Sequence, residues 1–190
     1  MQIVLPLRVT KQPTPAVYPG GDCGPCALAG LTDLTVREVY EDLIGKIAPP
    51  HFEAMRHILL QGQITGMFDR VIVDPATFQL PLWLQSWGSA AHLSASAWFH
   101  YVLMAVDAGY YGLAMVRLDR SGVHSAGPDH WVMICGARID AHREVLVSCP
   151  ARDRPDEEWV EAGEFLRARG GYNLLLVRPT KIEEQPAPLQ

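Results

Sequence analysis

The hydrophobic positions of this chain follow a helical period up to residue 109. Apolar residues three and four apart predict helices over residues 24–31, 36–45, 52–61 and 94–108. Thr35 followed by Glu38 is a capping-box pattern, in which each side chain can bond the backbone N–H of the other, and it predicts the start of the second helix. The last helix has the clearest pattern, because Trp98 and Tyr101 recur at helical spacing and Gly109 follows as a C-terminal cap.

Beyond residue 109 the period changes to that of strands. Apolar segments predict strands over residues 112–118, 131–137, 145–149 and 172–177, and weaker signals add 3–9 and 71–73. Residues 155–169 start acidic and end basic, as the helix macrodipole prefers, and predict a helix before the last strand. Helices followed by strands are typical of the α+β class, which we therefore expect.

The chain has the length and composition of one globular domain. Its 190 residues can bury a core without disulfides, and 48% hydrophobic against 19% charged residues argues against disorder. There is neither an internal repeat nor a linker that would divide it. The sequence predicts a single domain over residues 1–178 and a flexible tail rich in Pro, Glu and Gln over residues 179–190.

Charge and hydropathy exclude two classes of partner. The formal net charge is -5 and no block of Lys or Arg occurs, so no nucleic acid is expected as a partner. No apolar run reaches the roughly 18 residues of a membrane helix, so no membrane partner is expected. The four cysteines lack the spacing of a disulfide framework. We expect a cytoplasmic protein, or one that is exported without a recognisable signal peptide.

Cys23 is the first candidate for chemistry. The glycines of the loop before it permit a sharp turn, which delivers the cysteine to the first turn of an apolar helix. The partial positive charge of a helix N-terminus favours the thiolate, which is the nucleophilic form of cysteine. Cys26, one turn further on, is interpreted as a small buried hydrophobic residue.

His130 is the candidate base for that nucleophile. It opens a buried strand directly after the loop 125–129, where a rigid first residue can face a cleft. The other six histidines lie in contexts typical of surface or packing positions: His51, His57, His92, His100, His124 and His142. Of the neighbours of the two candidates, Asp22 and Asp129 are interpreted as loop hydrogen-bonding residues and Trp131 as a core residue.

Three stretches in this order resemble the papain-like cysteine peptidases. They are Asp22-Cys23-Gly24-Pro25-Cys26-Ala27-Leu28-Ala29, Asp129-His130-Trp131-Val132-Met133-Ile134 and Val147-Ser148-Cys149-Pro150-Ala151. The resemblance is greatest to the bacterial, bacteriocin-processing peptidases that cut leader peptides after a double glycine. It covers the start and the C-terminal half of the chain, whereas residues 45–93 show no match.

The resemblance implies a fold and an activity. The fold would be papain-like, with an N-terminal helical part that carries the nucleophile and a C-terminal antiparallel sheet that carries the histidine. The activity would be thiol-dependent hydrolysis or acyl transfer at a peptide or isopeptide bond of a peptide or protein substrate. Cys23 would be the nucleophile and His130 the base, and no cofactor or metal is implied.

Two positions depart from the family pattern. The family has a glutamine about six residues before the cysteine, which completes the oxyanion hole; this chain has Val17 there, and Gln12 is the alternative donor. The family has an aspartate before the proline that follows the next strand; this chain has Cys149 there. Asp153 or Asp140 are alternative partners of the histidine, and the sequence leaves the choice open.

Three other functions compete with the peptidase interpretation. A papain-like scaffold with reduced catalysis could serve as a binding or inhibitory module. Cys23 and Cys26 form the CxxC pattern of dithiol redox proteins, although the preceding strand of a βαβ unit is missing. The four cysteines Cys23, Cys26, Cys135 and Cys149 could bind zinc, but only one CxxC pair exists and Cys135 lies inside a predicted strand.

Overall fold

The computed structural model describes residues 1–7, 10–18, 21–45, 51–72, 94–116, 130–168 and 174–180. Trp83 and Trp87, whose spacing of four residues predicts a helical packing face, lie outside these residues. So do His92, His124, the loop that ends at Asp129, and residues 181–190 of the predicted tail. Pro179, the first residue of that predicted tail, is the last residue of a strand.

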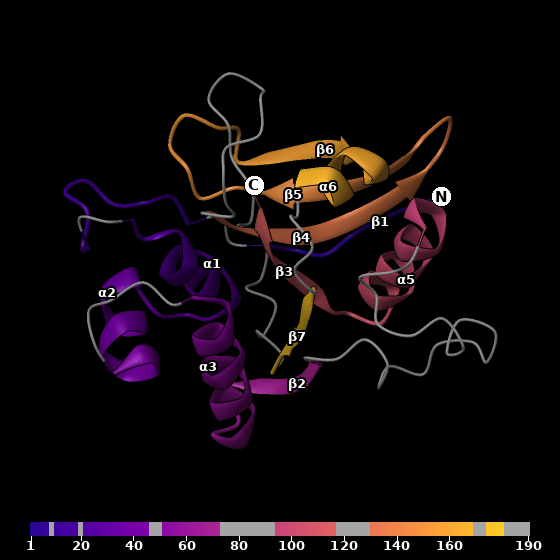
Figure 1. Ribbon diagram of the computed structural model, residues 1–190. Coiled ribbons are helices and arrows are strands. Elements are labelled where there is room, and N and C mark those ends of the chain that lie inside the picture. Colours follow the sequence, from indigo (N-terminus) through magenta and orange to yellow (C-terminus); the bar gives the residue numbers. More distant parts are fainter. Residues whose placement is uncertain are drawn as a thin grey trace, which may run out of the picture.

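A seven-stranded sheet forms the centre of the molecule (Figure 1). Its strands are β1 (Gln2–Val4), β2 (Phe68–Ile72), β3 (Tyr111–Val116), β4 (His130–Ile139), β5 (Arg143–Ser148), β6 (Glu157–Glu161) and β7 (Leu175–Pro179). They are ordered β2-β7-β3-β4-β5-β6, and β1 pairs with the second half of β4. The pairings between the described strands are antiparallel. The expected α+β class with an antiparallel sheet is therefore confirmed.

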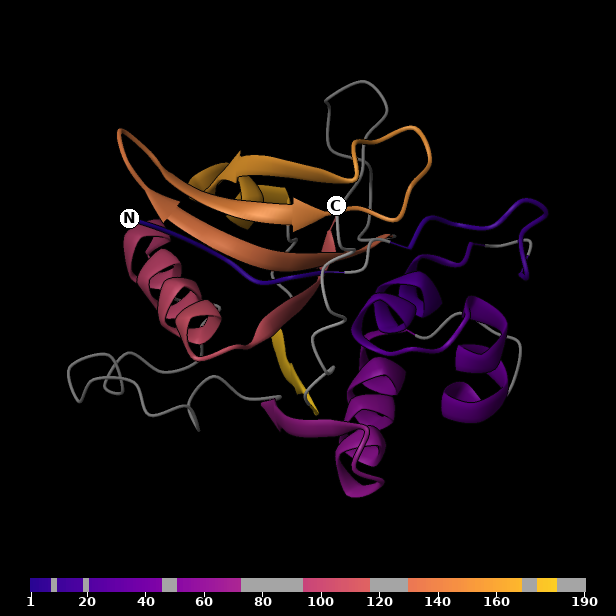
Figure 2. The same ribbon diagram turned by 180° about the vertical axis from the view of Figure 1, so that it is seen from behind.

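Helices cover both faces of this sheet (Figures 1 and 2). Those described are α1 (Cys23–Leu31), α2 (Val36–Glu38), the π-helix η1 (Val39–Ile44), α3 (Phe52–Ile64), α5 (Ala95–Asp107) and α6 (Ala162–Ala168). The capping box at Thr35 and Glu38 is present as predicted. The predicted helix over residues 36–45 is divided into α2 and η1, and it ends at Gly45, whose φ of 72° is the left-handed conformation that glycine favours.

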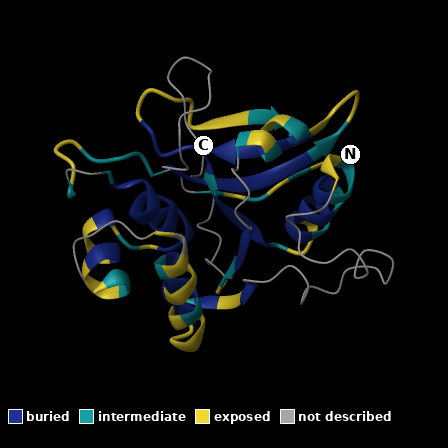
Figure 3. Ribbon diagram, in the orientation of Figure 1, coloured by how far each residue is buried: buried dark blue, intermediate teal, exposed yellow. Residues whose placement is uncertain are grey.

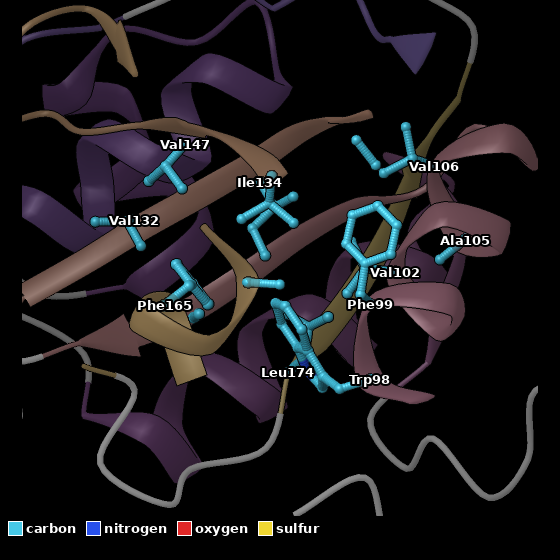
Figure 4. Packing of buried hydrophobic residues seen from close by; sticks show 14 of the residues in the cluster. Trp98, Phe99, Val102, Ala105, Val106, Val132, Ile134, Val147, Phe165 and Leu174 are labelled. Carbon is cyan, nitrogen blue, oxygen red and sulfur yellow. The ribbon is translucent and has the colours of Figure 1, made fainter. Parts of the chain in front are cut away.

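Two hydrophobic cores result from the alternation of side chains along β4. Val132 and Ile134 point to the face covered by α5 and α6, where Trp98 stacks on Phe165 with ring centroids 5.4 Å apart (Figure 4). Trp131, Met133 and Cys135 point to the face covered by α1 and α3. Successive side chains of a strand point to opposite faces, so one strand contributes to both cores. The sheet centre is accordingly buried, as Figure 3 shows.

The prediction of a continuous helix over residues 155–169 is wrong. Residues Glu157–Glu161 form β6, which pairs with β5, and only Ala162–Ala168 are helical. The open edge of β5 offers unpaired backbone groups, and pairing with them outweighs a local helical preference. Trp159 is half-buried in this strand and the Arg138 guanidinium lies 4.4 Å from its ring centroid.

Candidate active site

Cys23 is the first residue of α1, which is buried along its whole length. The turn before it contains Gly21, whose φ of 119° is a conformation that side chains disfavour. The cysteine itself is 8% exposed, so its thiol lies close to the surface but has little contact with water. The fold therefore places Cys23 at the helix start, as the sequence predicts.

Asp22 fixes the turn that presents Cys23. Its side chain is fully buried and accepts hydrogen bonds from the N–H of Val17 (2.9 Å), the N–H of Tyr18 (3.0 Å) and the hydroxyl of Tyr40 (2.8 Å). A buried carboxylate needs such donors to replace water. The interpretation of Asp22 as a loop hydrogen-bonding residue is confirmed. The sequence gives no signal for the contribution of Tyr40, because Asp22 lies 18 residues away from it in the chain.

The Cys23 thiol is held in its protonated form by burial. Desolvation is the largest influence and raises the pKa of Cys23. Hydrogen bonding from the backbone of Trp131, Gly24 and Cys23 itself acts in the opposite direction, and a negative charge on Cys149 would raise the pKa further. The sequence predicts a thiolate favoured by the helix N-terminus; burial reverses the direction of that shift.

His130 and Cys149 meet at one end of the sheet. His130 is the first residue of β4 and Cys149 follows the last residue of β5, and these two strands are antiparallel neighbours. The Nε2 atom of His130 lies 3.3 Å from Sγ of Cys149, and both residues are buried. Burial raises the pKa of Cys149, whereas the Ala151 backbone and the positive charges of Lys11 and Arg154 lower it.

Cys23 lies close to this pair. Its sulfur receives hydrogen bonding from the backbone of Trp131, the residue after His130, and it is near enough to Cys149 for the two thiols to influence each other's charge. Trp131 is 2% exposed and belongs to the core on the α1 face, as predicted. The structure thus brings the two predicted candidates, Cys23 and His130, to one region, and Cys149 of the same region contacts the imidazole.

The alternative carboxylates do not contact His130. Asp140 follows the opposite end of β4, where its carboxylate accepts from the His142 N–H (3.0 Å). Asp153 is exposed in the loop after β5, from which its charge acts on Cys149. Among the described residues that the sequence proposed as third group, Cys149 is the one in contact with the imidazole.

Gln12 lies beside the turn that leads to Cys23. A Cβ atom placed on Gly21 would be 3.9 Å from the Gln12 amide nitrogen, so the side chain reaches the backbone two residues before the cysteine. The Gln12 N–H donates to the Pro150 carbonyl (3.0 Å), which anchors its backbone near Cys149. Val17, at the family position of the glutamine, packs against the core on the α1 face.

The remaining cysteines, Cys26 and Cys135, are both buried. Cys26 is 1% exposed, and burial, with a smaller effect of the Asp22 charge, raises its pKa to about 12. Cys135 is fully buried in β4, where its sulfur lies 3.7 Å from a carboxylate oxygen of Glu157. Within the described part of the chain no three metal-ligating side chains gather in a way that would hold a metal ion.

No family model matches this chain, and no curated protein matches it. Over the residues that the structure describes, every helix is too short or too polar to cross a membrane. The geometry around Cys23, His130 and Cys149 is therefore what indicates a function.

Proposed function

We propose that the protein is a thiol-dependent hydrolase or acyl transferase acting on a peptide or isopeptide bond of a peptide or protein. The observation that carries the proposal is the contact of 3.3 Å between the His130 imidazole and Cys149, beside a cysteine at a helix start. A nucleophile, a base and a group that orients the base are the parts that such acyl transfer requires.

In the proposed reaction His130 accepts the proton of the Cys23 thiol as the sulfur attacks the substrate carbonyl. The tetrahedral oxyanion is stabilised by the Cys23 N–H and by the Gln12 amide. The intermediate collapses as the C–N bond breaks, and His130 returns the proton to the leaving amine, which leaves a thioester on Cys23. Water resolves the thioester in hydrolysis, and a second amine resolves it in transfer.

Burial decides when the thiolate forms. Because desolvation raises the pKa of Cys23, a free-standing thiolate is scarce at neutral pH. Reactivity at neutral pH must then depend on transfer of the proton to His130 at the moment of attack. This makes His130 a general base in the proposal rather than the permanent partner of an ion pair.

The test is the rate at which iodoacetamide alkylates Cys23 between about pH 5 and pH 10, read by mass spectrometry. We expect His130→Ala to slow alkylation at about pH 7 by roughly 100-fold, the usual contribution of a positioned base. The difference in rate between the two proteins should narrow as the pH rises, because hydroxide then removes the proton in both.

His100→Ala is the matched control, since His100 is a half-buried histidine in α5 whose Nδ1 lies 2.7 Å from the Ser96 carbonyl. This variant should alkylate like the unmodified protein. Equal rates for the unmodified protein and His130→Ala at every pH would reject the catalytic pairing. Rapid labelling of Cys23 and Cys26 in mutual exclusion, lost after mild oxidation, would instead favour a dithiol redox function.

A papain-like binding module is the second candidate, favoured by the burial that raises the pKa of Cys23. In that case the region around Cys23 would bind a peptide without turnover. An unreactive Cys23 in a folded protein, together with no effect of His130→Ala, is the result expected for this module.

A further inference from the structure

Lys11 inserts its ammonium group among four backbone carbonyls of one loop. Nζ lies 2.8 Å from the carbonyl oxygen of Cys149, 3.1 Å from that of Ala151, and 3.0 Å from those of both Arg154 and Pro155. Asp156 adds an ion pair at 3.2 Å, although its side chain is 71% exposed and contributes little. Lys11 therefore binds the segment 149–156, which directly follows β5.

This arrangement requires a cation. Four carbonyl dipoles that converge on one point repel one another unless a positive charge lies between them. Hydrogen bonds from a charged donor are about twice as strong as those between neutral groups. The folded shape of segment 149–156 consequently depends on an amino group that arrives from the other end of the chain.

The same segment presents Cys149 to His130. The first carbonyl that Lys11 holds belongs to Cys149 itself, and the second belongs to Ala151, whose backbone also bonds the Cys149 sulfur. Residue 12, next to Lys11, continues the connection: its N–H donates to Pro150 and its carbonyl accepts from the Arg152 guanidinium.

We propose that Lys11 is a positioning residue, which holds segment 149–156 so that the Cys149 thiol stays in contact with the His130 imidazole. The catalytic meaning of that contact rests on the proposed function. The structural link does not, because it is defined by the contacts of Lys11 alone. Lys11 acts through Cys149 and has no contact of its own with the nucleophile among those described.

Three variants test this link. Lys11→Met removes the charge at nearly constant length, Lys11→Arg keeps the charge, and Arg37→Met removes an exposed cation whose ion pair with Glu41 lies in the α2 region. Amide hydrogen exchange of segment 149–156 is read by mass spectrometry. In Lys11→Met we expect exchange to accelerate about tenfold or more, because strong charged hydrogen bonds are lost. Lys11→Arg should restore part of the protection, and Arg37→Met should leave it unchanged.

A second readout separates positioning from general stability. The rate at which iodoacetamide alkylates Cys149 is measured as a function of pH. The Cys23→Ser background removes the neighbouring thiol, so the profile reports the Cys149 thiolate alone. The charged and titratable groups around Cys149 are His130, Lys11, Arg154, Asp153 and, in the unmodified protein, Cys23. Since the Lys11 charge lowers the pKa of Cys149, Lys11→Met should move the alkylation profile to higher pH and Lys11→Arg should move it less.

Unchanged exchange of segment 149–156 in Lys11→Met would overturn the proposal, whatever the thiols do. So would a faster exchange spread equally over the whole protein, since that signals global destabilisation. If Lys11→Met loosens the segment while His130→Ala leaves Cys23 alkylation unaffected, the positioning role stands and the proposed function fails. If His130 controls Cys23 and Lys11→Met changes nothing, the positioning role fails alone.

Discussion

At the scale of residues, Cys149 is an unusual neighbour for a histidine that is proposed as a base. A neutral thiol is a weak hydrogen-bonding group, whereas a carboxylate accepts strongly from an imidazole and stabilises its charged form. Burial raises the pKa of Cys149, which keeps the thiol neutral at its distance of 3.3 Å from His130. In the proposed reaction the His130 imidazole would thus be oriented by a neutral thiol, where a carboxylate would also stabilise its charged form.

We expect Cys149→Asp to strengthen the base. A carboxylate beside the imidazole favours imidazolium, so alkylation of Cys23 at about pH 7 should accelerate by about tenfold or more. Cys149→Asn is the matched control, because it has similar size and no charge. Equal rates in the two variants would show that charge at this position has no influence on Cys23.

At the scale of elements, the capping box begins the helix that carries Tyr40. The Glu38 N–H donates to the Thr35 hydroxyl (3.3 Å) and the Thr35 N–H donates to the Glu38 carboxylate (2.7 Å). The Tyr40 hydroxyl in turn donates to Asp22, the residue immediately before Cys23. An exposed helix start therefore contributes to the shape of the site through one buried hydrogen bond.

We expect Thr35→Ala to lower the free energy of unfolding by about 1 kcal/mol, the usual effect of losing an N-cap, and Thr35→Ser to lower it much less. The loss of unfolding free energy in Thr35→Ala also depends on pH. Hydrogen bonding from Thr35 lowers the pKa of Glu38 below its ordinary value of 4.5, so the carboxylate contributes fully above that pH and the contribution is lost as the pH falls through the lowered pKa. Urea denaturation at about pH 7 and about pH 3 measures the free energy of unfolding of both proteins. A difference between the unmodified protein and Thr35→Ala that does not become smaller at low pH would contradict this prediction.

The ends of a helix were predicted correctly where capping residues stand on both sides of it in the sequence. Ser94 caps α5 through the Ala97 N–H, and Gly109 follows it with a φ of 82°. In contrast, Glu157 and Glu158 resemble the acidic first turn of a helix, but they are paired with Ser148 and Val147 of β5. Whether such a segment forms an edge strand depends on the neighbouring strand with which it pairs, and its own residues do not decide it.

At the scale of the whole molecule, the two hydrophobic cores lie on opposite faces of one sheet. A substitution that destabilises one core should therefore also destabilise the other. Ile134 is fully buried in β4 on the α5 face, whereas Ile64 is 78% exposed at the end of α3. We expect Ile134→Ala to lower the free energy of unfolding by about 2–5 kcal/mol and Ile64→Ala by less than about 0.5 kcal/mol.

The same experiment tests cooperativity. Trp98 reports on the core beside α5, and Trp131 on the core beside α1. Because β4 contributes side chains to both, chemical denaturation followed by fluorescence should show one transition that shifts as a unit in Ile134→Ala. Two separated transitions in single-tryptophan variants would contradict this view.

The sequence by itself determined what depends on neighbours along the chain: the periodic helices, the capping box, the buried strands, and a cysteine placed at a helix start. These features arise within a few residues, where backbone geometry and side-chain spacing decide the outcome. The sequence also indicated His130 and the unusual Cys149. The choice among Cys149, Asp153 and Asp140 remained open, because contact with His130 depends on how the strands pair.

Only the tertiary structure decided the rest. The pairing of β4 with β5 brings His130 against Cys149. Packing buries Cys23 and reverses the direction in which its pKa is expected to move. The Lys11 ammonium meets carbonyls that lie 138 or more residues away, so no local pattern announces it. Desolvation and long-range contact are properties of the assembled core, and they set the chemistry that this chain can perform.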